Sequence, residues 1–137
     1  MDKSGVFQRI INELPIDTVL DPNYRVTGVR SSHGELGLFY SIPSKTSERR
    51  SQKSIVRSEW EKAYKCLLDE GEYTLPWFKQ NMLITGRQST SCSFRVVGEV
   101  FAFLGLAQRV PSRPGYKYVR SDLQRGDDTR RCERGSS

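Results

Sequence analysis

The sequence predicts an α+β fold: one domain over residues 1–120, followed by a flexible charged tail over residues 121–137. Three observations support this prediction. Residues 24–42 alternate in the manner of a β-hairpin, residues 55–104 contain three helical patterns with start and stop signals, and a second hairpin pattern follows that stretch. At 137 residues the chain is long enough to bury one ordinary hydrophobic core.

An amphipathic helix is predicted over residues 4–14. Ser4 can cap its start, Pro15 ends it, and its apolar residues recur at helical spacing (Val6 or Phe7, Ile10, Ile11 and Leu14). A stripe this short cannot be stable alone. It must pack on the body of the domain or on a second copy of the chain, which is one reason to expect a homodimer.

A basic β-hairpin is predicted over residues 24–42, because β-branched and aromatic residues alternate with polar ones on both sides of a turn at Ser31–Gly34. A short extended piece, Ile16–Leu20, precedes it. Residues 44–53 contain no apolar side chain, so a loop or a disordered linker is expected there.

Two helices are predicted in the middle of the chain, after a short strand over residues 55–57. Ser58 and Glu61 have the spacing of a capping box, and the helix that they open runs to about Glu70, with Gly71 as its terminator. Thr74 is the expected cap of a second, short helix that reaches Met82 and carries Pro76 in its first turn.

A third, mostly apolar helix is predicted from Phe94 to Leu104, capped by Ser91 or Ser93 and ended by Gly105. Gly98 leaves the middle of its polar face without a side chain. A hairpin over residues 108–118 follows, with a tight turn at Ser112–Gly115. The expected buried residues of the core are Trp60, Tyr64, Leu67, Trp77, Phe78, Phe94, Val97, Phe101 and Leu104.

Three helices followed by a β-hairpin resemble a winged helix-turn-helix domain over about residues 55–120. The resemblance is one of order and pattern and includes no family signature. It implies that the third helix enters the major groove of DNA and that the hairpin is a wing on the phosphate backbone. The positions that it assigns to the groove are Gln88, Ser89, Ser91, Arg95 and Glu99, and those of the wing are Arg109, Arg113 and Lys117.

The positive charge is concentrated on the two hairpin regions. The chain has a net charge of +6 and a pI near 9.4. Residues 21–57 hold seven basic and three acidic side chains, a net +4, and residues 107–120 hold four basic and no acidic ones, again +4. Clustered Lys and Arg favour a polyanionic partner. We therefore expect binding to nucleic acid, duplex DNA first, through Arg25, Arg30, Arg87, Gln88, Ser91, Arg95, Arg109, Arg113 and Lys117.

Two other interpretations stay open at this point. Basic loops can be ordinary solvated surface, and a winged-helix scaffold can serve as a protein-interaction module. The second is favoured by the acidic residues of the first core helix, which are Glu59, Glu61, Asp69 and Glu70.

Catalysis, a metal and a cofactor are not expected. The chain has one histidine, His33, and three widely spaced cysteines, so no zinc set can be assembled, and it has no glycine-rich phosphate loop. No apolar run approaches the length of a membrane span and the start lacks a signal-peptide core, so a cytoplasmic location is expected. The patterns do not distinguish DNA from RNA or indicate a target sequence.

Overall fold

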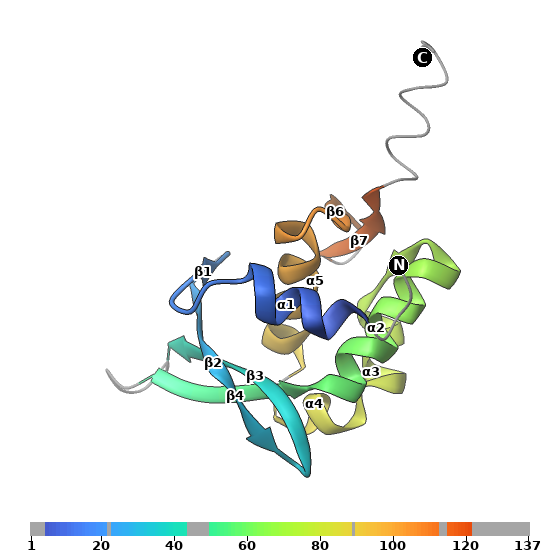
Figure 1. Ribbon diagram of the computed structural model, residues 1–137. Helices are drawn as coiled ribbons and strands as arrows, with labels where there is room; N and C mark the ends of the chain where they lie inside the picture. The colour runs from blue at the N-terminus through green and yellow to red at the C-terminus, as the bar shows by residue number, and fades with distance from the viewer. Residues whose placement is uncertain (1–4, 22, 44–49, 89, 113–114, 122–137) are drawn as a thin grey trace.

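The fold is mixed α and β, as expected. The computed structural model describes residues 5–21, 23–43, 50–88, 90–112 and 115–121, and these residues form five helices and two antiparallel sheets. In Figure 1 the larger sheet lies at the lower left, the smaller sheet at the top, and the helix α5 (Ser91–Phe103) between them. Of the tail predicted over residues 121–137, all but Ser121 lies outside the described residues.

The larger sheet has four strands in the order β1 (Val19–Leu20), β2 (Tyr24–Ser32), β3 (Glu35–Pro43) and β4 (Arg50–Val56). Strands β2 and β3 are the predicted hairpin. Positive φ angles of 50° at His33 and 82° at Gly34 close its two-residue turn.

The expectation of a loop over residues 44–53 is wrong from Arg50 onward, because β4 begins there and pairs with β3 from Arg50 to Val56. A polar edge strand has no alternation of apolar residues to reveal it. Its backbone pairing, which composition does not report, decides its structure. Residues 44–49 lie outside the described residues.

Helix α1 (Val6–Glu13) packs its apolar stripe into its own chain. Val6, Phe7, Ile10 and Leu14 are buried, and the helix contacts α2 (Arg57–Glu70). The apolar stripe of α1 is therefore covered by its own chain and does not require a second copy. The homodimer stays a prediction.

The helical middle begins as expected, although its cap differs. Helix α2 starts at Arg57 with Val56 as its N-cap. Ser58 instead donates its backbone N–H and its hydroxyl to Glu35 at 2.7 and 2.8 Å. The predicted capping box of Ser58 and Glu61 is therefore wrong. Gly71 ends the helix at a φ of 77°, as predicted.

The second predicted helix is α3 (Leu75–Asn81), and a further helix that was not predicted, α4 (Leu83–Gln88), follows it after Met82. Thr74 caps α3 as predicted, because its side chain accepts a hydrogen bond from Trp77 N at 3.4 Å. The short strand β5 (Glu72–Tyr73) lies between α2 and α3.

Helix α5 is the central element, with seven of its thirteen residues buried. Thr90 is its N-cap, and neither Ser91 nor Ser93 caps it. The hydroxyl of Ser93 is buried and forms a hydrogen bond with Tyr40 of the larger sheet. Gly105 follows the helix at a φ of 77°, which confirms its predicted left-handed conformation.

The predicted two-stranded wing is part of a three-stranded sheet. Strands β6 (Ala107–Pro111) and β7 (Tyr116–Arg120) form the hairpin, and β5 pairs with β7, so that the sheet order is β5-β7-β6. The hairpin is therefore held on one side by β5, and β6 packs on α5. Arg113, at the predicted tip, lies outside the described residues.

One hydrophobic core joins both sheets and the helices. The predicted core residues are buried with one exception, Trp77, which is only partly buried. The aromatic rings of Tyr73, Phe94, Phe101 and Tyr118 meet in its centre, with Tyr73 and Phe94 stacked at a centroid distance of 4.8 Å. The larger sheet adds Val26, Leu38, Tyr40 and Ile55, which its hairpin pattern did not single out.

Candidate nucleic-acid interface

The face of the larger sheet that points away from the core is basic and polar. Cross-strand partners share a face, and Arg25 pairs with Ser41, Phe39 with Ser54 and Ser41 with Gln52. We call this the outer face of the larger sheet, and its members that matter below are Arg25, Arg30, Phe39 and Gln52. The opposite face carries Val26, Leu38 and Tyr40 into the core.

Arg30 is positioned by two contacts on the outer face. Its guanidinium lies over the ring of Phe39, 4.1 Å from the centroid, and it donates a hydrogen bond to Gln52. A guanidinium stacked on a ring keeps its outward N–H groups free for an anion. Arg25 is exposed and forms no ion pair with any described residue.

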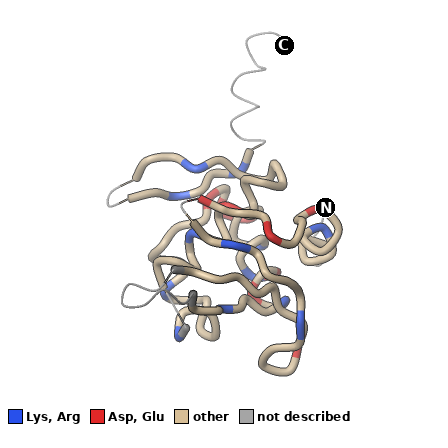
Figure 2. The backbone as a smooth tube through the Cα atoms, turned by 90° about the vertical axis from the view of Figure 1, so that its left-hand side faces the viewer, with Lys and Arg blue, Asp and Glu red and all other residues tan. Residues whose placement is uncertain are grey.

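Only one acidic residue belongs to the four strands as described, and it is already engaged. Glu35 accepts the backbone N–H and hydroxyl of Ser58 at the start of α2. The strands also carry Arg25, Arg30 and Lys53, and none of these three forms an ion pair among the described residues. In Figure 2 the blue segments, which mark Lys and Arg, are spread over several parts of the backbone. No described acidic residue therefore neutralises the positive charge of these strands.

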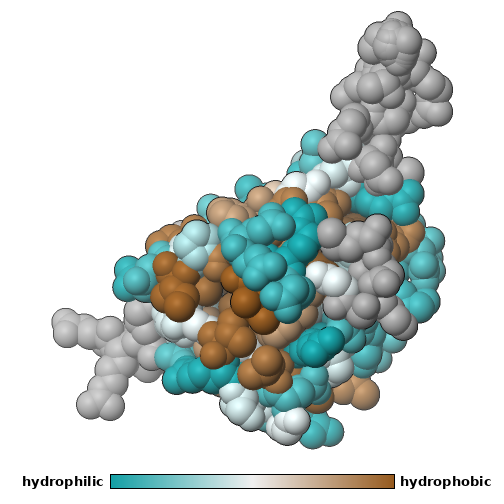
Figure 3. Space-filling view, viewed as in Figure 1, coloured by the Kyte–Doolittle hydropathy of each residue, from teal (hydrophilic) through white to brown (hydrophobic). Residues whose placement is uncertain are grey.

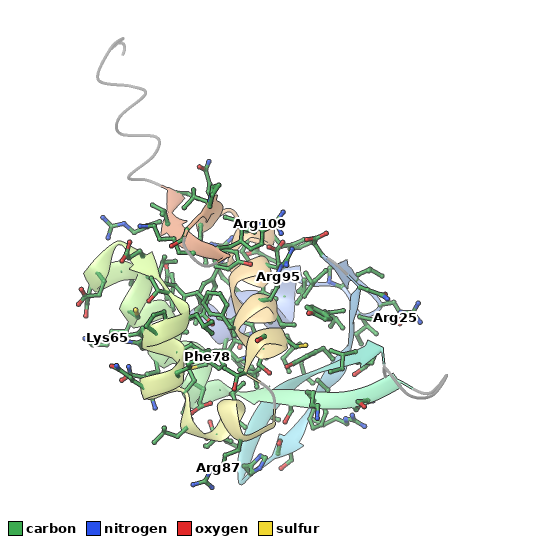
Figure 4. The ribbon with its side chains drawn as sticks, turned by 180° about the vertical axis from the view of Figure 1, so that it is seen from behind. Arg25, Lys65, Phe78, Arg87, Arg95 and Arg109 are labelled. Atoms are coloured by element: carbon green, nitrogen blue, oxygen red, sulfur yellow. The ribbon has the colours of Figure 1, made fainter. Side chains whose placement is uncertain are left out.

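A second cluster of charge lies where α5 meets the hairpin. Arg95 of α5 donates to the Asp21 carboxylate, and Arg109 of β6 donates to Asp21 at 2.8 Å and to Glu99 at 3.0 Å. Both guanidiniums also lie over the ring of Tyr116, at 5.1 and 5.0 Å from its centroid. Figure 4 shows Arg95 and Arg109 together beside α5, apart from Arg25 and Arg87. We call these residues the arginine cluster: Asp21, Arg95, Glu99, Arg109 and Tyr116.

The arginine cluster is electrically balanced, with two arginines facing two carboxylates. The hydrogen bond from Arg109, and then the charge of Arg95, hold the pKa of Asp21 below its usual value. The same contact raises the pKa of Arg109. Arg95 and Arg109, predicted to contact bases and phosphates, are thus occupied by carboxylates of their own chain.

Gly98 is the point at which the hairpin crosses α5. The prediction of a bare helix face is wrong there, because the ring of Tyr118 lies against Gly98 and leaves no room for a side chain. The Tyr118 hydroxyl continues to Glu99 and donates to it at 2.8 Å. Burial, together with this carboxylate, raises the pKa of Tyr118 above its usual value.

Lys117, the other described cation of the predicted wing, is also paired. Its ammonium lies 2.9 Å from the carboxylate of Glu72. Both residues line a groove of about 620 Å³ between β7 and α3, together with Leu75, Lys79 and Tyr116. The groove therefore holds one paired and one unpaired lysine among the described residues.

The other predicted contact residues are dispersed. Arg87 is exposed in the last turn of α4, forms no ion pair with a described residue, and points outward at the bottom of Figure 4. Ser91 is exposed at the start of α5. Gln88 ends α4, and the side chain of Gln88, like Ser89 and Arg113, lies outside the described residues.

The described ranges contain no group of three or more His, Cys, Asp or Glu side chains that could hold a metal ion. His33 is exposed at the β2–β3 turn, where its Nδ1 lies 2.9 Å from the hydroxyl of Ser32. No helix within the described residues is long and apolar enough to cross a membrane.

Sequence reasoning missed two members of the arginine cluster. Asp21 belongs to a turn signal, and it lies 74 residues before Arg95 and 88 before Arg109. Tyr116 alternates with Lys117 in the hairpin, which indicates a strand but not what its ring faces. One signal was available in the sequence: the alternation of residues in the hairpin. It places Arg109 and Tyr118 on one face, because these two residues are directly paired in the register of β6 and β7.

Comparisons with known proteins assign no family. No family model matches the chain, and neither a curated protein nor a solved structure does. The function must therefore be argued from the site alone.

Proposed function

We propose that the protein binds nucleic acid, with duplex DNA as the first candidate, through phosphate contacts on the outer face of the larger sheet. The observation that carries the proposal is the distribution of unpaired charge. Arg25 and Arg30 are exposed on that face and meet no acidic partner among the described residues, whereas Arg95, Arg109 and Lys117 are all ion-paired. A guanidinium without a carboxylate partner can neutralise a phosphate, and each neutralised phosphate releases counterions from the nucleic acid.

The binding is expected to depend little on base sequence. Phosphate contacts position a protein on nucleic acid without reading bases. Arg95 is the only arginine on the helix expected to read bases, and its guanidinium is engaged by Asp21 in the free protein. The interface is therefore expected to consist of contacts to the phosphate backbone of the nucleic acid.

Within this proposal, residues 55–120 act as a winged-helix-like scaffold. The order of helices and the following hairpin support that description. The extra helix α4 and the strand β5 on the hairpin depart from the simple plan that the sequence predicted. The scaffold holds the larger sheet in place through hydrogen bonds. Tyr40 of the sheet forms one with Ser93 of α5, and Glu35 accepts another from the hydroxyl of Ser58 at the start of α2.

The test is a salt series of duplex binding, followed by fluorescence anisotropy, with a charge-matched control. The variant Arg25→Gln/Arg30→Gln removes two outer-face charges, and Arg57→Gln/Lys65→Gln removes two exposed charges of α2 that are ion-paired. We expect the first variant to weaken binding and to lower the slope of log K against log salt by about two, since each phosphate neutralised contributes about 0.9 to that slope. The control should keep the slope of the wild type.

Two outcomes contradict the proposal. One is a wild-type protein that shows no salt-dependent binding at low ionic strength. The other is a control variant that lowers the salt slope as much as the outer-face variant does. The attraction would then depend on the net charge of the protein and not on the outer face of the larger sheet.

A second candidate function, a protein-interaction module, has one observation in its favour. Ile11, Ile16 and Val19 are exposed, at 41%, 63% and 57%. Figure 3 shows hydrophobic groups gathered on the side where α1 and β1 lie. The acidic residues that first favoured this class do not support it, because Glu59 is buried and Glu61 and Asp69 are ion-paired.

Sedimentation at micromolar concentration tests the self-association form of this second candidate. We expect an apolar contact through Ile16 and Val19 to give a dimer that Ile16→Lys abolishes, because a lysine in an apolar interface would be desolvated. A monomer of the formula mass for the wild type would contradict it.

A further inference from the structure

We propose that Arg95, Arg109 and Tyr116 form a second phosphate-binding site, and that the carboxylate of Asp21 occupies this site until nucleic acid displaces it. The inference rests on the proposed function, because the anion that it assigns is a backbone phosphate of the same nucleic acid. It differs from that function in its location, at the junction of α5 with the hairpin.

The geometry of the arginine cluster is that of an anion site. Arg95 and Arg109 come from different elements and direct donors to the same oxygen, Oδ2 of Asp21. Both guanidiniums lie over Tyr116, whose ring face attracts cations and holds them in place. Two guanidiniums that converge on one anion, on an aromatic support, suit a phosphate as well as a carboxylate.

Asp21 is the member of the cluster that can leave. Its side chain is 54% exposed, whereas those of Arg95 and Arg109 are 23% and 34% exposed. It follows β1, a strand of only two residues at the edge of the larger sheet. Displacing the Asp21 carboxylate therefore opens the site from the solvent side without disturbing the core.

Glu99, the other carboxylate, is fixed in place. Its side chain is 14% exposed, and it accepts hydrogen bonds from Tyr118 at 2.8 Å and from Arg109 at 3.0 Å. When Asp21 leaves, two arginines face this single carboxylate and the site gains one positive charge. Nε of Arg95 is buried and has no hydrogen-bond acceptor among the described residues, so the donors of this guanidinium are not saturated even while Asp21 is bound.

The position of Asp21 links this site to the outer face of the larger sheet. In the register of β1 and β2, Leu20 pairs with Tyr24 and Val19 with Arg25. Asp21 therefore directly follows β1, and Arg25 lies in the strand that pairs with β1, at the same edge of the larger sheet. A nucleic acid that contacts Arg25 meets the sheet edge that carries Asp21.

The decisive variant is Asp21→Asn, which removes the charge and keeps the shape. Its matched control is Asp69→Asn on α2, where the acid is 53% exposed and also ion-paired, with Lys65. Both variants raise the net charge by one. In anisotropy titrations with a short duplex DNA, we expect Asp21→Asn to raise affinity about 5- to 10-fold at low salt, the size of a modest coupling between sites. The salt slope should steepen by about one to two.

A second substitution shows whether the gain passes through the arginines. In Asp21→Asn/Arg109→Gln the affinity should return to the wild-type value or below it. Thermal melting confirms that each variant is folded, and Asp21→Ser replaces Asp21→Asn in the same series should the amide disturb the connection between β1 and β2.

The outcomes separate this inference from the proposed function. If the wild type binds and Asp21→Asn gains no more than Asp69→Asn, the second site is refuted and the outer-face proposal stands. If Asp21→Asn binds and the wild type does not, the arginines form a phosphate site, but the displacement of Asp21 by nucleic acid and the outer face as an interface are both refuted. If neither protein binds, both are refuted.

Discussion

Replacing Gly98 with alanine tests the packing of the hairpin on α5 at a single atom. The added Cβ would lie 2.0 Å from Cε1, 2.2 Å from Cζ and 2.3 Å from Cδ1 of Tyr118. Nonbonded carbon atoms prefer about 3.5–4.0 Å, so the ring would have to retreat by about 1.5 Å.

The ring of Tyr118 has little freedom to move. It is fully buried, lies 5.7 Å from Phe94 and 6.0 Å from Tyr73 between ring centroids, and donates its hydroxyl to Glu99. Overpacking of this kind costs about 1–3 kcal/mol, and the loss of a hydrogen bond to a carboxylate costs about 1.5–3 kcal/mol. Alanine regains about 1 kcal/mol over glycine in a helix. We therefore expect Gly98→Ala to lower the free energy of unfolding by about 1.5–5 kcal/mol.

Urea unfolding followed by circular dichroism measures this change, and Gly86→Ala in α4 is the matched control. A Cβ at Gly86 would meet its nearest atom, Cε1 of Phe78, at 3.9 Å, which is ordinary contact. The control should be neutral or more stable by up to about 1 kcal/mol, as helix propensity predicts. If Gly98→Ala also proves as stable as the wild type, the close approach of Tyr118 to α5 is refuted.

Three further changes test other parts of the fold. Glu59→Ala should lower the free energy of unfolding by about 3–5 kcal/mol, because the buried Glu59 carboxylate accepts the N–H groups of Ile84 and Thr85 at 3.1 and 2.8 Å. The control Glu61→Ala, at a partly exposed and ion-paired position of the same helix, should cost less than about 1 kcal/mol in the same urea titration. Equal losses for the two variants would contradict the role of the buried Glu59 carboxylate at the start of α4. Phe101→Ala should cost about 3–5 kcal/mol in thermal melting, and a wild-type melting temperature would refute its place in the core. Burial raises the pKa of Tyr24 to about 12 and raises the pKa values of Tyr40, Tyr73 and Tyr118 above the usual range. Since the unfolded chain loses these protons near pH 10, the stability they contribute should be complete below about pH 10 and fall as the pH rises above it. A urea midpoint that does not change from about pH 9 to 12 would contradict this.

The candidate site differs more from its sequence-based prediction than the fold does. Arg25, Arg30 and Arg87 are exposed, as a contact residue must be, and their types and strand or helix positions were enough to predict that. Arg95, Arg109 and Lys117 have the same chemistry and similar local patterns, yet each is paired with a carboxylate distant in sequence. Nothing local distinguishes a free arginine from a paired one.

Elements with local signals could be predicted from the chain alone. The turn at His33 and Gly34, the left-handed residues Gly71 and Gly105, and the Thr74 cap all appear where the pattern places them. The apolar face of α5 is likewise buried as its spacing predicts. In each case the energy that selects the conformation arises within a few residues, from φ preference, capping or the helical repeat.

Which elements meet one another became known only from the three-dimensional arrangement. Strand β5 pairs with β7, the polar strand β4 extends the larger sheet, and Tyr118 closes over Gly98. The carboxylate of Asp21 also accepts hydrogen bonds from Arg95 and Arg109. These two predicted contact residues are therefore already engaged in the free protein. Strand pairing and the neutralisation of charges depend on the distance between residues in space. For residues 70 or more positions apart, no periodic pattern in the sequence indicates that distance.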